Sequence, residues 1–148
     1  MAFQFPLEAV FHYHKSVEHQ QELRLRTANQ HLARARHLLE QLDLRRAKLR
    51  ANQAQHLEHG LTSAELHFGV LSEHALDQSR QQIVTEVARL QSLRDQQFRI
   101  FQHARRERES FASLRARQLR EYNLDAARRE QRNLDDLFLL RRNYQERS

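Results

Sequence analysis

A regular repeat of small and aliphatic residues in the first third of the sequence constrains the fold more than any other feature. The residues follow one another in steps of three and four, with Arg46 at the one position that lacks an apolar side chain; they are Leu25, Ala28, Leu32, Ala35, Leu39, Leu42 and Leu49. This spacing is typical of a coiled-coil seam. Charged and amide side chains fill the other positions, so the helix has one apolar stripe. It can bury that stripe only against a second helix.

Residues that form turns are almost absent. The 148 residues include two glycines and one proline, while helix-favouring Leu, Ala, Gln, Glu and Arg dominate. Charged residues make up 30% of the chain and hydrophobic residues 39%, so we expect a seam rather than a compact core. The fold class that follows is all-α, with residues 1–148 forming a single coiled-coil domain.

Four signals within seven residues mark a break between two helices. Gly60 can adopt the left-handed conformation that ends a helix. Thr62 can cap the next helix, and Glu65, three residues later, completes a capping box. Leu61 and Leu66 occupy the positions of a hydrophobic staple. Since the link is so short, the two helices must run antiparallel, and the partner of the first is the chain's own second half.

These signals predict an antiparallel two-helix coiled-coil hairpin whose second helix is longer than the first. The first helix should span about residues 6–58, the turn about 59–62 and the second helix about 63–145. At 1.5 Å per residue the helices measure roughly 80 and 120 Å, so the second should extend past the first by several turns, unless it folds back near Gly69.

The apolar residues are spaced less regularly outside this repeat. Ahead of Leu25, the steps from Val17 to Gln21 and from Gln21 to Leu25 are both four residues long, which predicts a stutter in the supercoil. The expected stripe of the second helix is Leu66, Leu71, Ile83, Val87, Leu90, Phe98, Phe101, Phe111, Leu114, Leu119 and Tyr122.

No catalytic motif is recognisable, so we expect a protein that is not an enzyme and uses no cofactor. His56 and His59 lie one helical turn apart, but without a third ligand they are better explained as helix-end surface than as a metal site. Cysteine is absent, which fits a reducing cytosol and excludes thiolate ligands. We see no signal peptide, and the apolar run 137–140 is too short to cross a bilayer, so a soluble protein is expected.

The net charge of +6 comes almost entirely from arginine. Glutamate and aspartate interrupt the densest positive stretch, residues 105–132, as in a solvated helix face with i,i+4 ion pairs. We therefore expect no nucleic-acid partner, although a basic coiled coil that binds RNA or DNA stays open as a third hypothesis.

Two groups of apolar residues fall outside the seam. The first, Leu134 to Tyr144, is an interaction site on the projecting helix or the core of a homodimer. The second, just past the turn, consists of Phe68, Leu71 and Ala75 on one helix face. It is either seam packing or a docking face.

The chain resembles the FliJ family, a small coiled-coil component of the bacterial flagellar type III export apparatus with a relative in virulence injectisomes. The resemblance rests on a Phe-rich start, a central turn and the sequence Glu-Gln-Arg-Asn-Leu-Asp-Asp-Leu at residues 130–137. It implies a hairpin similar to the stalk of rotary ATPases, placed in the hexameric export ATPase. It also implies contact with the cytoplasmic domain of the membrane export gate, recycling of export chaperones, and a role in flagellum biogenesis and chemotaxis.

The resemblance also implies where these partners bind. The expected export-gate contacts are Leu42, Leu49, Phe68, Leu71 and Ala75. The expected ATPase-ring contacts are Phe3, Phe5, Arg132, Leu134, Asp135, Leu137 and Phe138. The protein would be a cytoplasmic monomer, peripheral at the inner face of the cell membrane through its partners. A parallel homodimer that uses the repeat of residues 25–49, and the equivalent stalk of an injectisome, are the alternatives.

Overall fold

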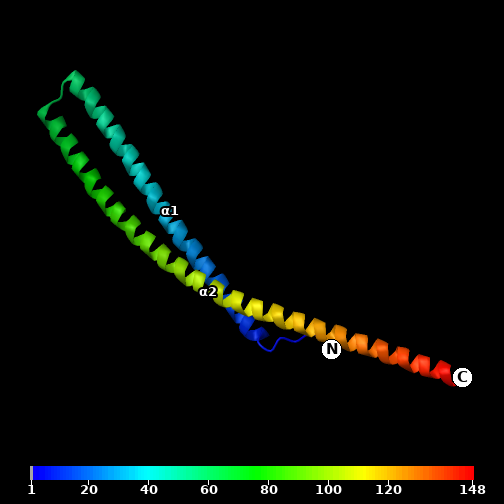
Figure 1. The fold of residues 1–148 in the computed structure, drawn as a ribbon. Helices are drawn as coiled ribbons and strands as arrows, with labels where there is room; N and C mark the ends of the chain where they lie inside the picture. Colours follow the sequence, from blue (N-terminus) through cyan, green and yellow to red (C-terminus); the bar gives the residue numbers. More distant parts are fainter. Residues whose placement is uncertain (1) are drawn as a thin grey trace. The chain divides into compact units, whose positions relative to one another are not determined.

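The structure, a computed structural model, describes residues 2–148 and contains two helices, α1 (Glu8–His59) and α2 (Ser63–Arg147) (Figure 1). No residue between 2 and 148 lies in a strand. The helices pack against each other and α2 is the longer, which confirms the predicted all-α helical hairpin. The chain divides into two compact units. We call residues 19–102 the turn unit, and the described residues before and after them the terminal unit. The single-domain organisation stays a prediction.

The structure confirms the roles of Gly60 and Thr62 in the turn between the helices. Gly60 has a φ of +89°, the left-handed conformation that a side chain would strain. The Thr62 hydroxyl accepts a hydrogen bond from the backbone N–H of Glu65 at 3.3 Å, so it caps the first turn of α2. The Thr62 carbonyl accepts one from the N–H of Leu66 at 3.1 Å. Together these contacts end one helix and start the next within three residues.

The turn unit is centred on the predicted seam of α1. Leu32 is 2% exposed and Ala35 is also buried, and the other members of the repeat are half-buried. Three ion pairs cross from α1 to α2 in the turn unit: Asp43–Arg80 at 2.9 Å, Arg46–Asp77 at 2.7 Å and Arg50–Glu73 at 3.3 Å. As the residue number rises on α1 it falls on α2, which fixes the antiparallel register.

The facing row on α2 differs from the expected stripe. Leu66, Leu71 and Phe98 are exposed. The half-buried positions follow steps of four and three instead: Leu76, Arg80, Ile83, Val87, Leu90, Arg94, Gln97 and Phe101. Polar residues are tolerated there because they reach partners on α1 or solvent at the edge of a thin seam; the Gln97 side-chain amide donates to Gln21 Oε1 at 2.7 Å. A count of apolar residues alone could not detect this repeat.

The terminal unit packs the start of α1 and the segment before it against α2. Phe5, Phe11 and Ala104 are buried. The ring of His14 stacks on that of Phe111 with 4.7 Å between centroids. Glu18, which is half-buried, occupies the seam position between residues 14 and 21, so the steps of three and four continue. Val17 is half-buried as well, so the predicted stutter stays a prediction.

The end of α2 continues beyond the N-terminal segment of the same unit (Figure 1). Tyr122 is the last half-buried residue, and every residue from 123 to 148 is exposed. We call residues 123–147 the overhang. At 1.5 Å per residue it is about 37 Å of helix.

Candidate interaction surfaces

The overhang carries part of its apolar residues on a side of α2 that the seam does not use, although Leu139 lies on the seam side. Continuing the seam past Tyr122 in steps of three and four leads to charged positions: Asp125, Arg129, Arg132 and Asp136. Leu134, Leu137 and Phe138 share another face, because residues three and four apart lie on one side of a helix. These three side chains are more than half exposed. This apolar face is thus a surface in its own right and not an unused end of the seam.

Two other expected ring contacts lie away from this face. At about 100° per residue, Arg132 lies about 160° around the helix from Leu134. Asp135 lies about 160° from Leu137 and accepts a hydrogen bond from Gln131 Nε2 at 3.1 Å. A flat partner could not contact both sides of this single helix, whereas a partner that encloses it could.

Phe3 and Phe5, also expected as ring contacts, both belong to the terminal unit, and Phe3 packs against α2. Phe5 is 6% exposed. The ring of Phe3 lies 5.6 Å from that of Tyr122, and the Arg115 guanidinium lies 5.8 Å from its centroid. The Arg115 side chain also donates to Glu8 at 2.9 Å. The structure therefore places Phe3 where the overhang begins, apart from the apolar face at 134–138, and buries Phe5 within the terminal unit.

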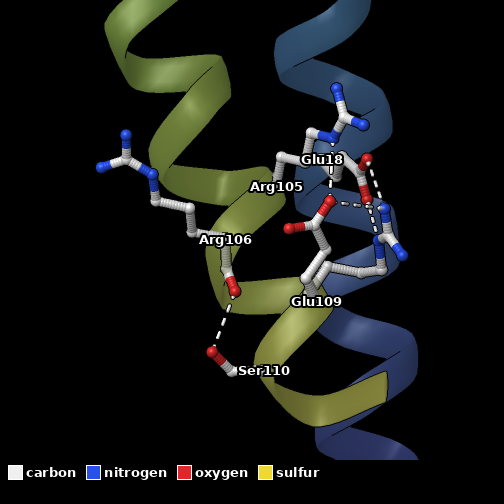
Figure 2. Close-up of polar contacts among 6 residues, drawn as sticks. Glu18, Arg105, Arg106, Glu109 and Ser110 are labelled. Carbon is white, nitrogen blue, oxygen red and sulfur yellow. Dashed lines mark hydrogen bonds and ion pairs between the residues drawn. The ribbon is translucent and has the colours of Figure 1, made fainter. Parts of the chain in front are cut away.

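A polar cluster in the terminal unit includes a contact between α1 and α2, the pair of Glu18 and Arg108 (Figure 2). The Arg108 guanidinium donates to both carboxylate oxygens of Glu18, at 2.5 and 3.3 Å. Arg105 donates to Glu109 at 3.0 Å. Hydrogen bonding to Glu18 raises the pKa of Arg108. Arg106 points away from α1 in Figure 2 and leaves its charge to solvent.

A second apolar surface lies beside the turn. A groove of about 640 Å³ is lined by the end of α1 and the start of α2; its residues include Leu49, Leu57, Leu66, Phe68 and Val70. We call it the turn groove. Phe68 is 72% exposed, and Leu57, Leu66 and Val70 are also exposed. This exposure is unusual for four large apolar residues in one place.

The structure brings only part of the expected gate-contact set together. Leu49 and Phe68 line the turn groove, from opposite helices. Leu71 and Ala75 are exposed on the same face of α2 as Phe68. Leu42 is half-buried within the seam and offers less surface.

Sequence reasoning missed the contributions of Leu57 and Val70. Neither falls on a seam position, and that mismatch is the signal that could have identified them. Gly69, which lines the groove between them, allows a close approach: a Cβ there would lie 2.7 Å from Gln53 Nε2. The glycine thus lets a polar side chain of α1 lie against α2 where the seam ends.

Both surfaces offer apolar area flanked by charge, which is the chemistry of protein docking. Within residues 2–148, no three His, Cys, Asp or Glu side chains gather as a metal site. In the same described range, neither helix combines the length and apolar character needed to cross a membrane.

The sequence matches a known protein family. The family described as Flagellar FliJ protein matches residues 3–147, nearly the whole chain. No curated protein and no solved structure matches the sequence.

Proposed function

Since this chain belongs to the family of flagellar FliJ proteins, we propose that it is the non-enzymatic stalk that couples the export ATPase ring to the membrane export gate. Family membership makes it a component of the flagellar export apparatus, in a family of structural proteins that is not a known enzyme family. The specific partners and contacts below belong to the proposal.

The overhang is the observation that carries this proposal. It is a single helix with an apolar face at Leu134, Leu137 and Phe138, and with Arg132 and Asp135 on other sides. An enclosing partner, such as the central channel of a hexameric ring, uses all these sides at once. Phe3 and Phe5 would then act indirectly, by fixing the N-terminal segment to α2 at the base of the overhang.

The surface beside the turn is the proposed docking site for the cytoplasmic domain of the export gate. Phe68, Leu71 and Ala75 present one exposed face, and Leu49 adjoins it through the turn groove. Leu42 would support this face from within the seam. The ring-binding and gate-binding residues thereby belong to different compact units, and a single chain can hold both partners.

The coupling would be mechanical and would follow mass action. A stalk that binds the engaged states of the ring and the gate more tightly than their free states shifts both partners toward the engaged states. The size of this shift cannot exceed the difference between the affinities of the stalk for the two states. We also propose that the protein is a monomer by itself in dilute solution, sits at the inner face of the cell membrane only through its partners, and assists the recycling of export chaperones. The alternatives to this function are the equivalent stalk of a virulence injectisome and a homodimeric structural coiled coil.

The test of the ring contact is stimulation of the cognate ATPase hexamer. Burying a Phe side chain contributes about 1.5–3 kcal/mol, so Phe138→Gln should weaken ring binding about tenfold or more. Removal of residues 134–148 should abolish the binding. Leu44→Gln, an exposed leucine of α1 outside both surfaces, is the matched control and should bind as the native chain does. A demonstrated complex with no change in hydrolysis rate would contradict the stalk role.

The gate contact is tested separately. Phe68→Gln with Leu71→Gln should weaken binding to the cytoplasmic domain of the gate, while stimulation of the ATPase persists. Loss of both activities in this double variant would contradict the assignment of one surface to each partner. In cells, the same variant should reduce flagellar export and hence swimming and chemotaxis.

A further inference from the structure

We propose that the turn groove also binds the overhang of a second copy of this chain, so that free molecules associate head to tail. The proposal concerns the protein outside the export apparatus and does not depend on the export role. It rests on the complementary chemistry of the two surfaces: the groove offers an apolar lining with negative charge, and the overhang offers apolar anchors with positive charge.

The groove has the form of a helix-binding site. It is lined by α1 on one side and α2 on the other, and its volume of about 640 Å³ offers Leu57, Leu66 and Phe68 as apolar lining. Amphipathic helices enter such grooves through apolar anchors spaced three and four residues apart.

The overhang supplies anchors at that spacing. Leu134, Leu137 and Phe138 are at positions i, i+3 and i+4, and Leu140 and Tyr144 extend the apolar surface toward the C-terminal end of α2. Because the overhang has no partner helix in its own unit, it can enter a groove without disturbing the seam.

The charges around the two surfaces are opposite. Residues 49–76 carry one arginine against three glutamates, Glu58, Glu65 and Glu73, a net charge of −2 in a chain whose total is +6. The overhang, residues 123–147, carries six arginines against five carboxylates, a net charge of +1, and this positive excess lies toward its C-terminal end, where residues 138–147 carry a net charge of +2. Opposite charge at the two ends favours head-to-tail contact, and it disfavours contact between two overhang ends or two turns.

A contact between different surfaces leaves one groove and one overhang free at the ends of every assembly, so the chain of copies stays open. Such association would cover the same apolar residues that the proposed export contacts use. Self-association and partner binding would then exclude each other. In free protein, the apolar residues of both surfaces would be covered by neighbouring copies.

Mixing two variants tests the proposal with the purified chain alone. Phe68→Gln impairs the groove and leaves the overhang intact, while Phe138→Gln does the reverse; both positions are exposed, so the hairpin should fold normally. We expect the mass of the native chain in sedimentation equilibrium to rise continuously with concentration above about 10 µM, the range of small interfaces. Each variant alone should remain monomeric to at least tenfold higher concentration.

The decisive sample is the equimolar mixture. It should form a dimer and stop there, because one intact groove meets one intact overhang. Raising the salt should weaken this dimer. A dimer of Phe68→Gln alone would overturn the proposal in favour of overhang-to-overhang pairing, and so would a mixture that stays monomeric or a native chain that stays monomeric at every concentration. Leu44→Gln should associate as the native chain does.

Discussion

Leu32 is the residue at which the seam is tested most directly. Its side chain is 2% exposed in the turn unit, the lowest value among the buried residues that the structure describes. Replacing a buried leucine by alanine costs about 2–5 kcal/mol, from lost burial and from the cavity left behind. The flanks of a two-helix seam are open to solvent and can close partly over a gap. We therefore expect Leu32→Ala to lower the free energy of unfolding by about 2–3 kcal/mol.

The matched control is Leu44→Ala, which makes the same chemical change on α1 at a side chain that is 63% exposed. Surface substitutions of this kind change stability by about 0.5 kcal/mol or less. Both variants would be unfolded in urea and followed by circular dichroism at a protein concentration too low for self-association. Equal stability of Leu32→Ala and Leu44→Ala would show that the repeat of residues 25–49 is not the packed seam described here.

Three further predictions concern polar contacts and the turn. A double-mutant cycle with Glu18→Gln and Arg108→Leu should give a coupling energy of about 1 kcal/mol in urea unfolding, because the pair is partly buried and doubly hydrogen-bonded. A coupling energy near zero would contradict the role of the pair in fixing the register of the two helices. Arg89 lowers the pKa of Glu86, chiefly by hydrogen bonding, so the pair favours the folded state above the usual carboxyl pKa of 4.5 and loses this contribution as the pH falls. An NMR titration should therefore place the midpoint of Glu86 below 4.5. In Arg89→Gln the midpoint should return toward 4.5. Gly60→Ala should destabilise the hairpin by about 1 kcal/mol in the same unfolding assay because of its positive φ, and an unchanged stability would place the turn elsewhere.

The seam of α1 and the turn could be predicted because their signals are local. The steps from Leu25 to Leu49 are nearly all apolar, and the cap at Thr62 needs only its own neighbours. The seam of α2 could not be predicted to the same extent. Positions such as Arg80 and Gln97 belong to it because of side chains on the other helix, which hydrophobic periodicity does not record.

Of the two candidate surfaces, the overhang could be predicted from the sequence and the turn groove could not. The exposed apolar run from Leu134 to Tyr144 is visible in the sequence because the stretch before it, residues 123–133, has Leu124 as its one large apolar residue. The turn groove is not visible, because it forms only where Leu57 of α1 and Val70 of α2 come together. The burial of Phe5 also required the structure, since an aromatic residue just before a helix can pack or dock with equal ease from sequence alone.

The account as a whole requires that one chain folds back on itself. The chain contains no cysteine, so His31→Cys with Ser92→Cys gives two unique sites for spin labels, both exposed and both within the turn unit. Packed helices lie about 8–10 Å apart, so the double electron–electron resonance distance should be below about 30 Å. It should be unchanged when labelled chains are diluted with unlabelled ones. A distance near 90 Å, the length of about 60 residues in one continuous helix, or a short distance that disappears on dilution, would contradict the hairpin.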